Sequence, residues 1–216
     1  MSMSPLPRRA RQFLLWLHIL SSVGWMSQAM ALTVLLVQRD AAGTAAAHLL
    51  DTTILVASAN CSAASGFLLS ATTPYGFFLH RWVLVKFVIT VAQLVIGIFV
   101  LSPWLNTAGA DPRPQLIVMT VVMASLIAFQ GLLSVVKPWG RVPRRPTRAP
   151  VPPVPVIVAA PFALVADLVM FATTGRPTPI FALLTLIVVL VARARYGSDG
   201  PRPRTPLART VVAGQA

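Results

Sequence analysis

Long apolar runs, separated by short polar and basic segments, make up most of this chain. The first run, residues 13–37, contains one ionisable side chain and follows three arginines. As a helix it would be ~37 Å long at ~1.5 Å per residue, which is enough to cross a hydrocarbon core of ~30 Å. Five further runs follow at residues 49–71, 82–102, 116–136, 156–172 and 180–192. The pattern predicts an all-α, polytopic membrane helical bundle with about six transmembrane helices.

A basic, proline-rich segment separates the first four runs from the last two. Residues 141–155 contain four Arg and six Pro, which excludes a helix and favours an extended, polyproline-type linker. A partner-binding PxxP segment is the alternative interpretation. We therefore expect a four-helix transmembrane domain at residues 1–140, this linker at 141–155, a C-terminal transmembrane hairpin at 156–196, and a disordered basic tail at 197–216.

Composition and charge agree with a membrane protein. Hydrophobic residues make up 56% of the 216 residues and charged residues 11%, against ~25% charged in a typical soluble domain. The net charge of +13 does not indicate nucleic acid, because the basic residues lie between the apolar runs. With six spans and the N-terminus inside, fourteen Lys and Arg fall in cytoplasmic segments, and three fall in outer loops: Arg39, Arg113 and Arg176. This bias predicts that both termini are cytoplasmic.

Two ionisable side chains, His18 and Lys86, lie near the predicted inner ends of the first and third runs. Each continues along its helix face into a stripe of polar or small residues: Ser21, Ser22, Trp25 and Ala29 after His18, and Thr90, Gln93 and Gly97 after Lys86. We expect both stripes to turn into the bundle, since polar groups in a bilayer need protein partners. One interpretation is that His18 hydrogen-bonds to another helix and Lys86 snorkels to the inner surface; a ligand site is the other.

The second run is the least hydrophobic and is rich in small residues. Ser58, Ser62 and Gly66 recur at a spacing of four residues, which predicts close packing against a neighbouring helix. Asp51 is expected to cap the start of this run, where a carboxylate meets the positive end of the helix dipole. Asn60, in the middle of the run, is a further polar candidate inside the membrane.

Asp167 is the deepest acidic residue, about twelve residues into the fifth run and hence ~18 Å from its inner end. We expect a protonated, hydrogen-bonded carboxyl group there, with a proton relay as the alternative. Asp167, Gln93 and Asn60 form the remaining set of intramembrane polar candidates.

Short motifs in the first half of the chain carry a family resemblance. They are LHIL and SVGW within residues 17–25, YGFF at 75–78 and WVLVK at 82–86. Residues 12–138 resemble an uncharacterised family of predicted bacterial integral membrane proteins, which is distantly similar to copper resistance D-like proteins and HemJ-type protoporphyrinogen oxidases. In the HemJ-type proteins a first-span His and a third-span Lys are implicated in haem binding and activity, and His18 and Lys86 match them. The resemblance implies a bacterial plasma membrane location and a candidate haem b site, with His18 as iron ligand.

Soft metal ligands suggest a weaker, copper-based alternative. Met26 with Met30, and Met119 with Met123, are spaced by four residues, and thioethers at that spacing could pass Cu(I). Cys61 is a further soft donor, although Met is more often a filler of gaps in a helical core. No zinc pattern, phosphate-binding loop or Ser-His-acid set with usable spacing is present in the sequence.

Three functions from different classes follow. The favoured one is a helical membrane scaffold or partner-assisting protein without catalysis, embedded in the lipid bilayer and paired with another copy or with other membrane proteins. The second is a haem-dependent oxidoreductase of HemJ-like kind that uses His18 and Lys86. The third is a copper or proton permease; the absence of Glu and the scarcity of intramembrane acids disfavour proton-coupled transport.

Overall fold

The chain folds into four long helical rods between residues 8 and 136. The computed structural model describes residues 7–73 and 75–142, and also residues 162, 165–167, 169–170, 173–174, 184, 187–188 and 190–191. The first rod is α1, Arg8–Val37, and the fourth is α6, Pro114–Val136. The second joins α2 (Ala41–Leu50), a π-helical turn η1 (Asp51–Leu55) and α3 (Val56–Thr72). The third joins α4 (Arg81–Ile96), a π-helical turn η2 (Gly97–Leu101) and α5 (Ser102–Asn106).

Each of the four rods is long and apolar enough to cross a membrane. Their outward faces carry large apolar side chains, with Val135 82% exposed, Phe99 71% and Val34 62%. A helix that is apolar on both its inner and its outer face suits a lipid environment, whereas water would favour a polar outer face. The prediction of an all-α chain with four long apolar helices over residues 1–140 is therefore confirmed.

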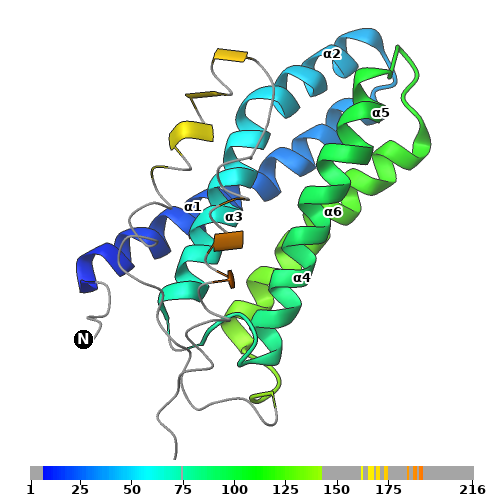
Figure 1. The fold of residues 1–216 in the computed structure, drawn as a ribbon. Coiled ribbons are helices and arrows are strands. Elements are labelled where there is room, and N and C mark those ends of the chain that lie inside the picture. Colours follow the sequence, from blue (N-terminus) through cyan, green and yellow to red (C-terminus); the bar gives the residue numbers. More distant parts are fainter. Residues whose placement is uncertain are drawn as a thin grey trace, which may run out of the picture.

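The rods run alternately up and down and enclose a common interior (Figure 1). α1 packs along α3 on one side and along α6 on the other, and α4 contacts both α6 and α3. Apolar side chains fill the interior in three layers. One layer is built on Leu36 and Leu116, a middle layer on Trp25, Ala59 and Ile127, and a third on Ala71 and Phe77.

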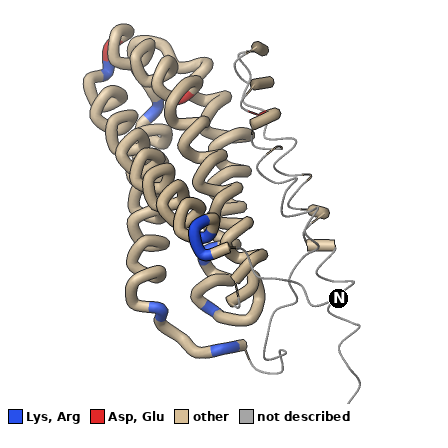
Figure 2. The backbone as a smooth tube through the Cα atoms, turned by 90° about the vertical axis from the view of Figure 1, so that its left-hand side faces the viewer, with Lys and Arg blue, Asp and Glu red and all other residues tan. Residues whose placement is uncertain are grey.

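The two ends of the bundle differ in charge (Figure 2). One end holds the starts of α1 and α4 and the end of α6. Its Lys and Arg residues, within the part of the chain that the structure describes, are Arg8, Arg9, Arg11, Arg81, Lys137 and Arg141. We call it the basic end. The other end, the mixed end, carries Arg39 and Arg113 together with Asp40 and Asp111. There the Arg39 guanidinium pairs with the Asp111 carboxylate at 3.4 Å.

The expected capping role of Asp51 is wrong. The second rod begins ten residues earlier than Asp51, at Ala41, and its N-cap is Asp40, whose carboxylate accepts the Gly43 N–H at 2.6 Å. The reason is that residues 41–47 are rich in alanine, the strongest helix former, and follow a residue type favoured at N-caps. Asp51 therefore lies inside a continuous rod, at the start of the π-helical turn η1.

Most of the C-terminal predictions lie outside the described residues. These are the linker beyond residue 142, the bulk of the hairpin at 156–196 and the tail at 197–216. Two described residues of the predicted hairpin are informative. Leu190 packs against the layer built on Ala71 and Phe77, and Asp167 is 3% exposed. Part of the C-terminal region thus contacts the four-rod bundle.

Candidate functional site

His18 lies in a close contact between α1 and α3. Its Nδ1 is 3.0 Å from the Ser62 carbonyl oxygen and 3.3 Å from the Ser65 hydroxyl. A Cβ on Gly66 would lie 2.9 Å from His18 Cε1, so the imidazole occupies space that only glycine leaves open. One turn further along, the Ser22 and Ser62 hydroxyls are 2.7 Å apart. The small residues of the second run therefore do pack closely against a neighbouring helix, as predicted.

The hydrogen bonding of the ring fixes its tautomer. Because the Ser62 carbonyl can only accept, Nδ1 carries the proton and donates it. In the neutral ring, Nε2 is then the nitrogen with a free lone pair. This arrangement, in which one ring nitrogen is held by a backbone carbonyl and the other is a base, is also the one that metal-ligating histidines adopt.

Lys86 is directed into the bundle from α4. Its ammonium donates to the Ser134 hydroxyl on α6 at 2.5 Å, and that hydroxyl donates to the Gln130 carbonyl oxygen at 3.0 Å. Lys86 also interacts electrostatically with His18. The two residues thus lie near each other, but their hydrogen bonds go to different helices, α3 for His18 and α6 for Lys86.

A pair of glutamines continues the polar contact between α4 and α6. The Gln130 amide donates to the Gln93 side-chain oxygen at 2.7 Å, and the Gln93 amide donates to the Met123 carbonyl at 3.0 Å. Thr90 donates to the Gln130 side-chain oxygen at 2.8 Å. Both glutamines are buried, Gln93 being 1% exposed. The stripe predicted on the Lys86 face therefore turns inward, where it binds α6.

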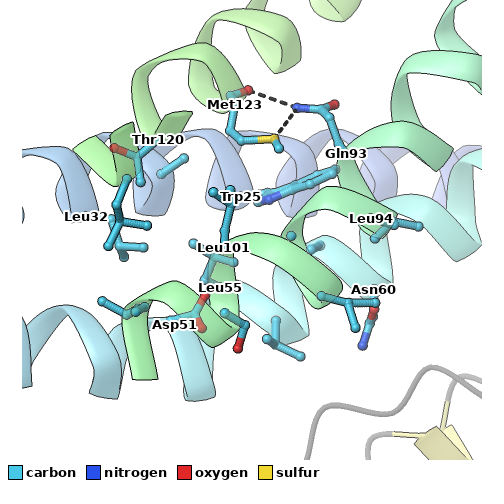
Figure 3. Close-up of a pocket in the computed structure, with 18 residues that line it drawn as sticks. Trp25, Leu32, Asp51, Leu55, Asn60, Gln93, Leu94, Leu101, Thr120 and Met123 are labelled. Carbon is cyan, nitrogen blue, oxygen red and sulfur yellow. Dashed lines mark hydrogen bonds between the residues drawn. The ribbon is translucent and has the colours of Figure 1, made fainter. Parts of the chain in front are cut away.

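A cavity of about 110 Å³ lies between the four rods, on the mixed-end side of the glutamine pair (Figure 3). Most of its lining is apolar. The polar side chains at its wall are those of Asp51, Asn60, Gln93, Ser102 and Thr120. Two of the intramembrane candidates, Gln93 and Asn60, thus meet at one cavity. The sequence did not place Asp51 there, because its position at the start of an apolar run resembled a cap.

The other sequence candidates are more dispersed. Met123 is buried at the cavity wall and Met26 is half-buried against the middle layer, whereas Met30 is 55% exposed on the outside and Met119 is half-buried. Cys61 is free and half-buried. Within the described part of the chain, no three His, Cys, Asp or Glu side chains are close enough to hold a metal ion together.

Comparison with protein-family models, with curated proteins and with solved structures finds no match to this chain. The family resemblance of residues 12–138 therefore stays a sequence-based expectation.

Proposed function

We propose that this protein is a helical scaffold of the bacterial plasma membrane that holds or assists a partner membrane protein or a second copy of itself. The observation that carries the proposal is that polar side chains inside the bundle form hydrogen bonds between different helices. Ser22 binds Ser62, Thr33 binds Thr120 at 2.8 Å, and Gln93 binds Gln130. Each bond joins two different rods, so these side chains serve to hold the helices together.

Such bonds set a rigid register between helices more than they add stability. In membrane proteins one interhelical side-chain hydrogen bond contributes ~0.6 kcal/mol on average and up to ~1.7 kcal/mol. The bonds join α1 to α3, α1 to α6 and α4 to α6. Three helix pairs are thereby fixed, while the large apolar side chains on the outer faces stay available for lipid or for another transmembrane helix.

The charge difference between the two ends supports the orientation. Among the described residues, six Lys or Arg lie at the basic end, and two lie at the mixed end, beside Asp40 and Asp111. Cytoplasmic segments of membrane proteins carry the excess of positive charge. The proposal therefore places the basic end in the cytoplasm, and with six spans both termini are cytoplasmic.

Photo-crosslinking in native membranes tests the scaffold. A photoreactive residue replaces Val135 or Phe99, which face outward, and Gln93, which faces inward, is the control position. The expected result is a discrete protein adduct from at least one outward position, and none from Gln93. Lipid adducts alone, at these and at every other exposed position on the four rods, would remove the basis for a scaffold.

His18 favours a second candidate, the haem-dependent redox protein. The ring is held at Nδ1 by a backbone carbonyl, so Nε2 keeps its lone pair in a fixed orientation, which suits an iron ligand. Lys86 would pair with a propionate, and bound haem would supply one-electron redox chemistry. Space for the haem is the obstacle, because neither His18 nor Lys86 lines the 110 Å³ cavity. A haem bound to His18 would need room beside α1 on the basic-end side.

Visible absorption of the purified protein tests this candidate. With haem supplied in excess, a Soret band is expected that His18→Ala abolishes and Lys86→Met only weakens. His80 is a second histidine on the basic-end side, where its Nδ1 contacts the Tyr75 carbonyl at 3.3 Å, so His80→Ala is the matched control. A colourless wild-type preparation that takes up no haem would leave the scaffold as the function.

A further inference from the structure

The 110 Å³ cavity combines features that the scaffold does not use. Asp51 is the one side chain able to carry a charge among the described residues that line it. The indole of Trp25 lies across the cavity wall, and Leu55 and Leu101 contribute apolar surface (Figure 3). Organic cations bind in proteins to carboxylates and to the faces of aromatic rings, and this apolar space has one group of each kind.

The backbone is irregular at this level on two rods. The π-helical turns η1, Asp51–Leu55, and η2, Gly97–Leu101, both contribute residues to the cavity wall. Such turns are rare, and they occur frequently at functional sites, because the wider turn displaces the helix face and opens space beside it. Two of them at one cavity indicate that the space is built into the fold.

The neighbourhood of Asp51 leaves the carboxyl group without a strong cation. The groups that act on it are the Ser102 hydroxyl from α5 and His48, one turn earlier on the same rod. His48 is itself hydrogen-bonded through Nε2 to the Asn106 side-chain oxygen at 2.8 Å. Arg39 is paired with Asp111 at the mixed end. Asp51 is half-buried beside a largely apolar space, where a carboxylate gains from a partner of opposite charge, and an incoming cation would supply one.

We propose that this cavity binds a small organic monocation of the alkylammonium class, with the charge beside Asp51, the Trp25 indole against the cationic carbons and the apolar wall around the alkyl groups. Size limits the ligand. A cavity of about 150 Å³ holds benzene, so this smaller space suits a ligand of about five heavy atoms. The site is separate from the His18 contact, so it stands or falls independently of the haem candidate.

The proposal is tested by titrating the purified full-length protein in lipid nanodiscs with tetramethylammonium chloride, using calorimetry and the shift in unfolding temperature. The comparison ligand is tert-butanol, which has the same number of heavy atoms and no charge. Tetramethylammonium should bind at least about tenfold more tightly than the alcohol, since contacts with a carboxylate and an aromatic face each favour the cation. Equal binding of the two would reduce the site to an apolar cavity and overturn the proposal.

Two variants locate the site. Asp51→Asn should weaken tetramethylammonium binding about tenfold or more, and Asp111→Asn is its matched control, because that carboxylate is 79% exposed at the mixed end. Gly97→Leu should abolish binding by filling the cavity. A Cβ at Gly97 meets nothing within 4 Å, so this substitution is expected to fold even if Asp51→Asn does not. Gly131→Leu, also without neighbours within 4 Å but away from the cavity, is the control.

Binding that survives Gly97→Leu, or that falls equally in Gly131→Leu, would place the cation elsewhere and refute the assignment. Loss of binding in Asp51→Asn and Gly97→Leu, with both controls unchanged, would establish it.

Discussion

Replacing Gly66 by alanine tests whether α3 is packed against the His18 imidazole. The new Cβ would lie 2.9 Å from Cε1, closer than carbon atoms pack, so the ring must move. That movement costs the bond from Nδ1 to the Ser62 carbonyl, ~0.6 to 1.7 kcal/mol in a membrane, and some overpacking, ~1 to 3 kcal/mol. Against this, alanine in a helix gains ~1 kcal/mol over glycine. We expect a net loss of ~0.6 to 3.7 kcal/mol.

A double-mutant cycle separates these effects. In a His18→Ala background the clash is gone, so Gly66→Ala should change sign and stabilise the protein by up to ~1 kcal/mol. The coupling between the two positions is then ~1.6 to 4.7 kcal/mol, the sum of the lost bond and the overpacking. The assay is reversible unfolding in mixed micelles, followed by circular dichroism. Gly131→Ala, where a Cβ meets nothing within 4 Å, should be unaffected by the His18 background. If Gly66→Ala costs the same with and without His18, the proposed packing of the ring on Gly66 is incorrect.

Two further predictions concern the glutamine pair and the topology. Gln93→Leu or Gln130→Leu should each destabilise the bundle by ~1 to 2 kcal/mol, because each leaves the buried amide of the other glutamine without its partner. The double variant should cost less than the sum of the two single variants. Additive costs in the same unfolding assay would argue against the pair. Reporters fused after Ala45, Gly109 and Gly175 should be active outside, and one after Gly214 inside; external activity at Gly214 with none at Gly175 would reverse the last hairpin.

The sequence was sufficient to predict the four rods, because the signal for each is ~20 consecutive apolar residues, and that signal does not depend on tertiary contacts. It also predicted which faces of α1 and α4 turn inward. Ser21, Trp25, Ala29 and Gln93 are all buried, as the four-residue spacing of the two stripes indicated. The contacts of Gly66 and Ser62 followed from their small size and regular spacing.

The partners of the polar residues could not be predicted in the same way. Nothing in the spacing of His18 shows that its ring meets the Ser62 carbonyl on α3, since that pairing depends on the rotation and tilt of two helices. The capping prediction for Asp51 is wrong because the hydropathy pattern marks the apolar run and overlooks the ten alanine-rich residues of α2 that precede it. The cavity was not predictable either, since it depends on two π-helical turns that have no clear sequence signal.

The polar side chains inside this bundle differ in their surroundings between the basic end and the mixed end. Toward the basic end, the polar contacts of His18, Lys86 and Gln130 are made with neighbouring helices, so they are largely engaged in holding the rods together. Toward the mixed end, Thr33 and Thr120 still join α1 to α6, but Asp51 and Asn60 border open space. Gln93 belongs to both, since its amide binds α6 while its side chain lines the cavity. A ligand in the cavity would therefore act directly on the contact between α4 and α6, and the α4–α6 pair is where a response of the scaffold to that ligand should be measured.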